Sequence, residues 1–245
     1  MPVKNTKRPT PPKGDGSQRL SARDRLLAAA DELFYAEGVH VVGVDRIVER
    51  AGVTKASLYN TFGSKDELVR AYLENHFRRR RSRIAAILAT QSTPRERLLS
   101  VFGEVEDLLA GSAFRGCRFI SAAAESAPGD SGTLVAEEYR AWLWSLFTDL
   151  ADEAGALNPK EIGRQLFLLY DGAAVAARMD QDRGSAAKAV RSAVVALLDA
   201  SIPATPRGRA KSRRARTEAG SSQASPAGSG ARGAAARSRA SAARA

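Results

Sequence analysis

The sequence predicts an all-α protein of about nine helices, and three observations indicate this fold class. Signals for the start of a helix recur: a Ser, Thr or Asn stands three residues before a Glu at Ser64, Thr93 and Asn158, and Ser21 stands three residues before Asp24. Apolar residues between these starts are spaced as on one face of a helix. No segment alternates apolar and polar residues between hairpin turns, so no sheet is expected.

Three short helices open the folded part of the chain. The first is expected over 21–37 with Gly38 as its terminator, and the second over 44–51. Gly52 suits the tight turn that follows because it adopts positive φ without strain. Thr54 can then cap a third helix of about two turns. Short helices joined by a short glycine-containing turn form a helix-turn-helix, although an ordinary helical corner shares this pattern.

The surface of the third helix favours DNA recognition. Leu58 and Phe62 lie four residues apart and can anchor the helix together. Its other side chains are short or polar, which lets the helix enter a major groove about 12 Å wide. The start of the next helix, with Lys65, favours a phosphate. The predicted DNA-contacting residues are Thr54, Lys55, Ala56, Ser57, Tyr59, Asn60, Thr61, Ser64 and Lys65.

Residues 23–73 resemble the N-terminal domain of the tetracycline-repressor (TetR) family. The matching features are A-x-x-L-F-x-x-x-G in the first helix, D-x-I in the second, and A-G-V-T-K-x-x-L-Y-x-x-F-x-S-K-x-x-L over the turn and third helix. Segment 116–125 also resembles one branch of the family, whereas Gly43 replaces a frequent Ser or Thr cap. The resemblance implies a homodimeric, ligand-responsive transcription regulator, usually a repressor, whose last two long helices pair with a second subunit.

The expected domains are a helix-turn-helix domain over 20–68 and a helical effector-binding and dimerisation domain over 69–202. Candidate pocket residues are Phe102, Val105, Phe119, Trp142, Leu146 and Tyr170, although aromatic residues at helical spacing also form ordinary cores. Candidate dimer-interface residues are Leu169, Ala173, Ala176, Val194 and Leu197, although small residues also suit an internal helix contact. The arginine run 78–81 lies about 20 Å along its helix from Lys65, so we expect a solvated or domain-bridging cluster.

The net charge of +11 is concentrated in two tails. Residues 1–19 carry five basic residues against one acidic, and residues 203–245 carry ten against one, so the part between them is slightly acidic. Both tails are poor in large apolar residues and are predicted to be disordered. They could solubilise the protein or hold nucleic acid without sequence preference, and the sequence leaves both open.

Other classes of protein find little support. The sequence has a single cysteine, Cys117, which excludes an intramolecular disulfide and a multi-Cys metal site. We expect Cys117 to be a small buried residue; the alternative is a redox sensor. No cofactor or metal is expected, and neither a phosphate-binding glycine loop nor a nucleophile elbow appears, so we expect no enzyme. The chain lacks an apolar signal sequence or membrane span, which predicts a cytoplasmic protein.

The sequence therefore predicts a sequence-specific transcription regulator, most simply a repressor released from a palindromic double-stranded DNA operator by an unknown small-molecule effector. The alternative is a nonspecific or architectural DNA-binding protein driven by its basic tails.

Overall fold

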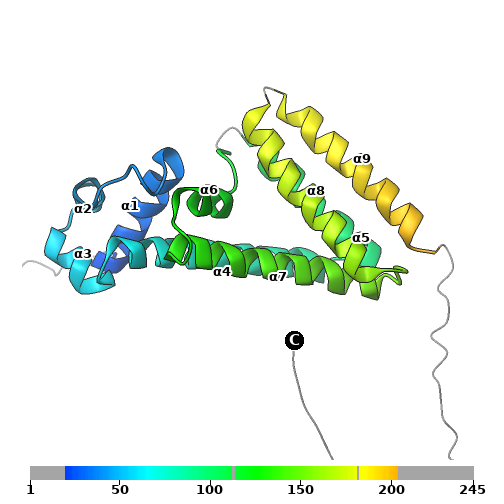
Figure 1. Ribbon diagram of the computed structural model, residues 1–245, viewed down its shortest axis with the longest axis horizontal. Coiled ribbons are helices and arrows are strands. Elements are labelled where there is room, and N and C mark those ends of the chain that lie inside the picture. Colours follow the sequence, from blue (N-terminus) through cyan, green and yellow to red (C-terminus); the bar gives the residue numbers. More distant parts are fainter. Residues whose placement is uncertain (1–19, 112–113, 181, 204–245) are drawn as a thin grey trace, which may run out of the picture. The chain divides into compact units, whose positions relative to one another are not determined.

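The computed structural model describes residues 20–111, 114–180 and 182–203, and all regular structure in this part of the chain is α-helical (Figure 1). Its helices are α1 (Ala22–Glu37), α2 (Val44–Ala51), α3 (Lys55–Phe62), α4 (Lys65–Ala89), α5 (Pro94–Ala110), α6 (Arg118–Glu125), α7 (Ser131–Glu153), α8 (Pro159–Met179) and α9 (Arg183–Ser201). The predicted all-α fold is confirmed. The predicted disordered tails, 1–19 and 203–245, lie outside the described residues apart from Pro203.

The helix starts follow the predicted caps, with one exception. The hydroxyls of Ser21, Thr54 and Ser64 each accept a hydrogen bond from the backbone N–H three residues on. At Thr93 the capping box is complete, because Glu96 also accepts from the Thr93 N–H at 2.9 Å. Asn158 occupies the N-cap position of α8, but its side chain makes no capping bond; its backbone φ of −130° and ψ of 76° differ from the usual cap geometry.

The turn between α2 and α3 is fixed from both sides. Gly52 ends α2 with φ 61° and ψ 44°, a left-handed conformation that favours glycine. Arg25 of α1 donates from Nη1 to the carbonyl oxygens of Ala51 and Gly52, at 3.3 and 2.9 Å. These carbonyls would otherwise be free at the end of α2, so α1 sets the angle at which α3 leaves the turn.

Helices α1, α2 and α3 pack together over a small apolar core, which includes the fully buried Leu26, Ile47 and Leu58. Helix α4 packs against this group at its start and continues as a 25-residue helix toward α7 and α5 (Figure 1). The predicted domain boundary between residues 68 and 69 therefore falls inside α4, so one continuous helix spans both of the predicted domains.

The C-terminal part is built on α7, which packs against α4, α5, α6 and α8. Helix α9 lies against α5 and α8. Three of its largest fully buried side chains, Phe102, Phe119 and Phe147, come from α5, α6 and α7. None of the described helices is both long enough and apolar enough to cross a bilayer.

Candidate DNA interface and buried cavity

Helix α3 is anchored by an apolar side and presents a polar side to solvent. Leu58 is fully buried, and Phe62 packs against the core with the Arg23 guanidinium 5.5 Å from its ring centre. Tyr59 keeps 45% of its surface exposed. The other exposed residues of α3 are Lys55, Ala56, Asn60 and Thr61. The predicted inward pair and outward polar face are thus both present.

Hydrogen bonds inside α3 occupy several of the predicted DNA-contacting groups. The Thr54 hydroxyl oxygen accepts from the Ser57 N–H and lies 2.9 Å from the half-buried Ser57 hydroxyl. The Thr61 hydroxyl donates to the Ser57 carbonyl at 2.6 Å. Asn60 has no hydrogen-bond partner among the residues that the structure describes, so its donor and acceptor are both open. Asn60 is exposed as well, so it remains a candidate for reading a base edge.

Lys55 and Lys65, the two predicted lysines, differ in how strongly other groups of the protein hold their ammonium groups. Lys55 forms an exposed ion pair with Asp45 at 3.0 Å, which solvent weakens and a phosphate could replace. Ser64 is half-buried and caps α4. Lys65 donates to the His40 carbonyl at 3.3 Å; partial burial lowers the pKa of its ammonium, and the nearby Glu125 carboxylate opposes that effect. Lys65 is therefore held against the loop after α1 as well as lying near the start of α4.

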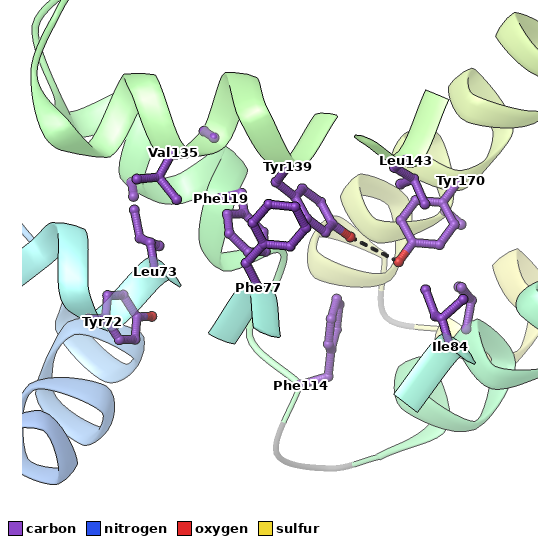
Figure 2. Packing of buried hydrophobic residues seen from close by; sticks show 14 of the residues in the cluster. Tyr72, Leu73, Phe77, Ile84, Phe114, Phe119, Val135, Tyr139, Leu143 and Tyr170 are labelled. Carbon is purple, nitrogen blue, oxygen red and sulfur yellow. Dashed lines mark hydrogen bonds between the residues drawn. The ribbon is translucent and has the colours of Figure 1, made fainter. Parts of the chain in front are cut away.

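A cavity of about 240 Å³ lies where α1, α4, α5, α7 and α8 meet the start of α6. Figure 2 shows aromatic side chains gathered beside it, with Phe77, Phe119 and Tyr139 face to edge or stacked and Phe114 below. Its lining residues are Asp31, Tyr35, His76, Arg79, Arg80, Arg83, Glu104, Val105, Phe114, Gly116, Cys117, Arg118, Phe119, Tyr139, Tyr170 and Ala174.

Half of the predicted pocket residues line this cavity. Val105, Phe119 and Tyr170 are among its walls. Phe102 is buried behind Tyr170 and stacks on Phe147, so it belongs to the core. Trp142 and Leu146 are half-buried on α7 and pack against the core outside the cavity.

A buried polar network crosses the cavity wall. Arg80 is only 8% exposed, and it donates at 2.5 Å both to Glu104, which is 5% exposed, and to the hydroxyl of Tyr170. Arg83 reaches the same Glu104 oxygen at 2.7 Å. The hydroxyls of Tyr170 and Tyr139 lie 3.2 Å apart (Figure 2), and burial raises the pKa of both phenols. The arginine run was expected to be solvated or domain-bridging, but Arg80 lies in the interior.

The wall of the cavity has an excess of basic residues. Four of its lining residues are arginines and two, Asp31 and Glu104, are acids. Burial, together with the nearby charges of Arg118, Arg80 and Arg79, lowers the pKa of His76 to about 3. This histidine is therefore neutral at physiological pH.

Cys117 lies in the same wall, at the N-cap of α6. Burial raises the pKa of its thiol, although the N–H groups of Phe119 and Ile120 partly offset this. The side chain is half-buried, and a protonated thiol lacks the thiolate character that a redox sensor needs, so the structure gives no support to the redox-sensor interpretation.

Helix α6 joins the cavity to the helix-turn-helix region. At its start, the Arg118 guanidinium stacks 3.5 Å from the ring centre of Tyr35 in α1. The Tyr35 hydroxyl in turn accepts from the Arg115 N–H at 2.7 Å. At the end of α6, the Glu125 carboxylate accepts a hydrogen bond at 2.8 Å from the backbone N–H of His40, a residue of the loop between α1 and α2.

Two of the five predicted dimer-interface residues lie inside the chain. Ala173 and Val194 are 0% exposed within a single chain, so they have no surface to offer a partner. Leu169, Ala176 and Leu197 are half-buried. The exposed apolar side chains of this region instead lie on α7 and α8: Leu134, Trp144, Leu168, Val175 and Met179. Helix α8 is apolar on most of its circumference, so sequence spacing alone did not identify its outer side.

The functional candidates missed by sequence reasoning are Glu104, Tyr139, Arg118 and Glu125. A signal for the network did exist, because Arg80 falls on the apolar stripe of α4 formed by Leu73, Phe77 and Ile84. A charged residue on such a stripe requires a buried partner.

Comparison with known proteins agrees with this geometry. The family described as "Bacterial regulatory proteins, tetR family" matches residues 26–72, which cover most of α1 through the first third of α4. The chain is 41% identical over 86 residues to the transcriptional activator FasR of Mycolicibacterium smegmatis, and 35% identical over 86 residues to the transcriptional repressor KstR2 of that species. These matches span 35% of this chain and 39% and 42% of the relatives, so the chain matches less than half of either protein.

Solved structures extend the likeness to the C-terminal part. SCO4454, a TetR-family transcriptional regulator from Streptomyces coelicolor, is 33% identical, with a TM-score of 0.71 over 74% of this chain and 96% of that one. A structure from Streptomyces avermitilis is 35% identical, with a TM-score of 0.65 over 74% and 98%. With its helix-turn-helix, its open α3 face and this likeness along nearly the whole of a family member, the chain belongs to the TetR family of DNA-binding transcription regulators.

Proposed function

We propose that the protein is a homodimeric repressor that binds a near-palindromic operator through α3 and leaves it when a small molecule occupies the cavity. The observation that carries this proposal is the wall of the cavity. Asp31 and Tyr35 belong to α1 of the DNA-reading region, whereas Glu104, Tyr139 and Tyr170 belong to the C-terminal part. A ligand in the cavity would therefore contact both regions at once.

The effect of the ligand would reach α3 through two routes. Helix α4 begins directly after α3 and supplies His76, Arg79, Arg80 and Arg83 to the cavity. Helix α6 begins at the cavity and holds the loop after α1 through Glu125. Ligand binding that moves either helix would change how two α3 helices are spaced. Such coupling is typically worth about 1–3 kcal/mol and acts equally on DNA and ligand affinity.

On DNA, we propose that Asn60 reads a base edge and that Lys55 and Tyr59 contact phosphates. Asn60 and Tyr59 are exposed, and the exposed partner of Lys55 is easily exchanged for a phosphate. Ala56 would allow close approach to the groove floor, where a methyl group can meet thymine. Thr54, Ser57, Thr61, Ser64 and Lys65 remain candidates for contacts that keep their present hydrogen bonds.

The dimer would form through the exposed apolar face of α7 and α8. A TetR-type regulator that reads a palindrome requires two copies of α3 about one helical turn of DNA apart. Leu168 offers the test: Leu168→Glu should give a monomer in light scattering and weaken operator binding. Leu157 in the α7–α8 turn is at least as exposed as Leu168, so Leu157→Glu is the control and should leave the dimer intact. A dimer that survives Leu168→Glu would contradict this face.

The proposed function is tested by selecting bound sequences from random DNA with the full chain. A regulator should enrich one near-palindromic sequence and prefer it by about 1,000-fold or more over random DNA. The alternative, binding driven by the basic tails, predicts no such preference. Removing residues 203–245, which carry most of the charge of the tails, should then weaken all binding strongly, whereas a specific regulator should lose only nonspecific affinity and part of its salt dependence.

A further inference from the structure

Glu104, a residue of the cavity wall, has an acceptor that the protein leaves unused. Glu104 places one oxygen, Oε1, against Arg80 and Arg83, at 2.5 and 2.7 Å. Its second oxygen, Oε2, is buried and has no hydrogen-bond partner among the protein groups that the structure describes. A buried acceptor of this kind is costly to leave unpaired, so a ligand that donates a hydrogen bond here gains affinity.

A hydrogen-bond donor is available next to the Arg80 guanidinium. Arg80 donates to the Tyr170 hydroxyl, and the hydroxyls of Tyr170 and Tyr139 share a single contact of 3.2 Å. Two phenol protons serve only one mutual bond, so one of them remains free to donate. A ligand hydroxyl can both donate to Glu104 and accept from a phenol.

The rest of the wall selects for a flat ring. The rings of Phe119 and Tyr139 are stacked with centroids 3.8 Å apart, and Tyr35, His76 and Phe114 also line the cavity. Aromatic rings bind other rings by stacking or edge contacts. The volume of about 240 Å³ exceeds the cavity of about 150 Å³ that holds benzene, which leaves room for one or two rings with small substituents.

The charge of the wall selects for an anion. Four arginines face two acids, so a cationic ligand would be repelled. Arg79 has no ion-pair partner among the described residues, and Arg83 is largely exposed with only its Nε on Glu104. Guanidinium groups bind carboxylates in bidentate geometry, so these two arginines suit a ligand carboxylate.

We propose that the effector of this protein is a hydroxylated aromatic carboxylate, with its hydroxyl between Glu104 and the Tyr139–Tyr170 pair and its carboxylate on Arg79 and Arg83. This inference rests on the proposed function, in which the cavity is the effector site.

The test measures binding to the full chain by isothermal titration calorimetry, without DNA. The probes are 4-hydroxybenzoate and 4-hydroxycinnamate, the hydroxyl-free benzoate and cinnamate, and the cationic phenol tyramine. At least one hydroxy acid should bind about tenfold or more tightly than its hydroxyl-free counterpart, because the latter leaves Glu104 unpaired. Tyramine should bind more weakly than the hydroxy acid. Equal binding with and without the hydroxyl, or no binding by either hydroxy acid, overturns the proposal.

Two variants test whether the ligand binds in the cavity. Glu104→Gln should weaken the hydroxy acid about tenfold, whereas Glu106→Gln, on the same helix but outside the cavity, should not. Tyr139→Phe removes only a hydroxyl and tests the same site. It replaces Glu104→Gln in the experiment if circular dichroism shows that Glu104→Gln does not fold. If neither Tyr139→Phe nor Glu104→Gln changes the affinity of the hydroxy acid, the ligand binds outside the cavity and the proposed site is wrong.

Operator binding, measured separately by fluorescence anisotropy, distinguishes the two proposals. Hydroxy acids that bind the cavity but do not release DNA support the ligand class and refute the inducer role. Failure of both hydroxy acids with intact, specific operator binding refutes the ligand class and leaves the DNA-binding regulator in place.

Discussion

The contact between α6 and the loop after α1 can be tested by adding one methyl group to Gly38. This residue has φ 100° and ψ 156°, a region that residues with a Cβ avoid at a cost of about 1–3 kcal/mol. A Cβ here would also lie 2.7 Å from both carboxylate oxygens of Glu125. The carboxylate would have to move and release the His40 N–H, which costs about 0.5–1 kcal/mol at this exposed position. Gly38→Ala should therefore destabilise the protein by about 1.5–4 kcal/mol.

A double-mutant cycle separates the two effects. We expect Glu125→Ala alone to cost about 0.5–1 kcal/mol, and to cost almost nothing once Gly38→Ala is present, because the contact is already lost. The assay is urea unfolding of the four proteins, followed by circular dichroism. Gly155→Ala is the control: its φ is +80° and no atom lies within 4 Å of the added Cβ, so its effect should add to that of Glu125→Ala. Additivity within about 0.5 kcal/mol for the Gly38 pair would refute the reasoning.

Three further predictions concern single residues. Arg80→Gln breaks a buried pair and should cost about 3–5 kcal/mol in unfolding free energy, whereas the exposed Arg81→Gln should cost under about 1 kcal/mol; equal costs would contradict the buried network. The pKa of His76 is about 3 in the folded state, below its unfolded value, so the free energy of unfolding should fall as pH drops from about 6.5 toward 3. The fall should reach up to about 1.4 kcal/mol per pH unit. His76→Gln should flatten this slope, and the control His40→Gln should not. Asn60→Ala should lower operator affinity by about 1–3 kcal/mol and relax selectivity at one base position, measured by anisotropy on single-base operator variants, while leaving thermal unfolding unchanged.

Local features were predicted well from the sequence because their causes are local. The caps at Ser21, Thr54 and Thr93 depend on groups three residues apart, and the turn at Gly52 depends on one residue's φ. The inward pair of α3, Leu58 and Phe62, follows from helical spacing alone. The family motif then assigned the role of that surface.

The cavity could not be predicted in the same way because its parts are distant in the chain. Arg80 meets Glu104 across 24 residues and Tyr170 across 90. Aromatic residues on α5 and α7 satisfy the spacing rule for both a core and a cavity wall. Spacing therefore does not separate Phe102 and Trp142, which lie outside the cavity wall, from Val105, which lies in it. The same ambiguity affected α8, where buried Ala173 and exposed Leu168 lie on opposite sides of one apolar helix.

The contact of Glu125 with the loop after α1 bears on the construction of hybrid regulators. A DNA-reading region from another family member could be joined to this sensing part within α4. The junction would transmit a signal only if the incoming α1 kept a tyrosine at position 35 for Arg118 and a glycine at position 38 beneath Glu125. Two positions in the imported helix and loop, far from the bases it reads, would then decide whether a hybrid acts as a sensor or merely binds DNA constitutively.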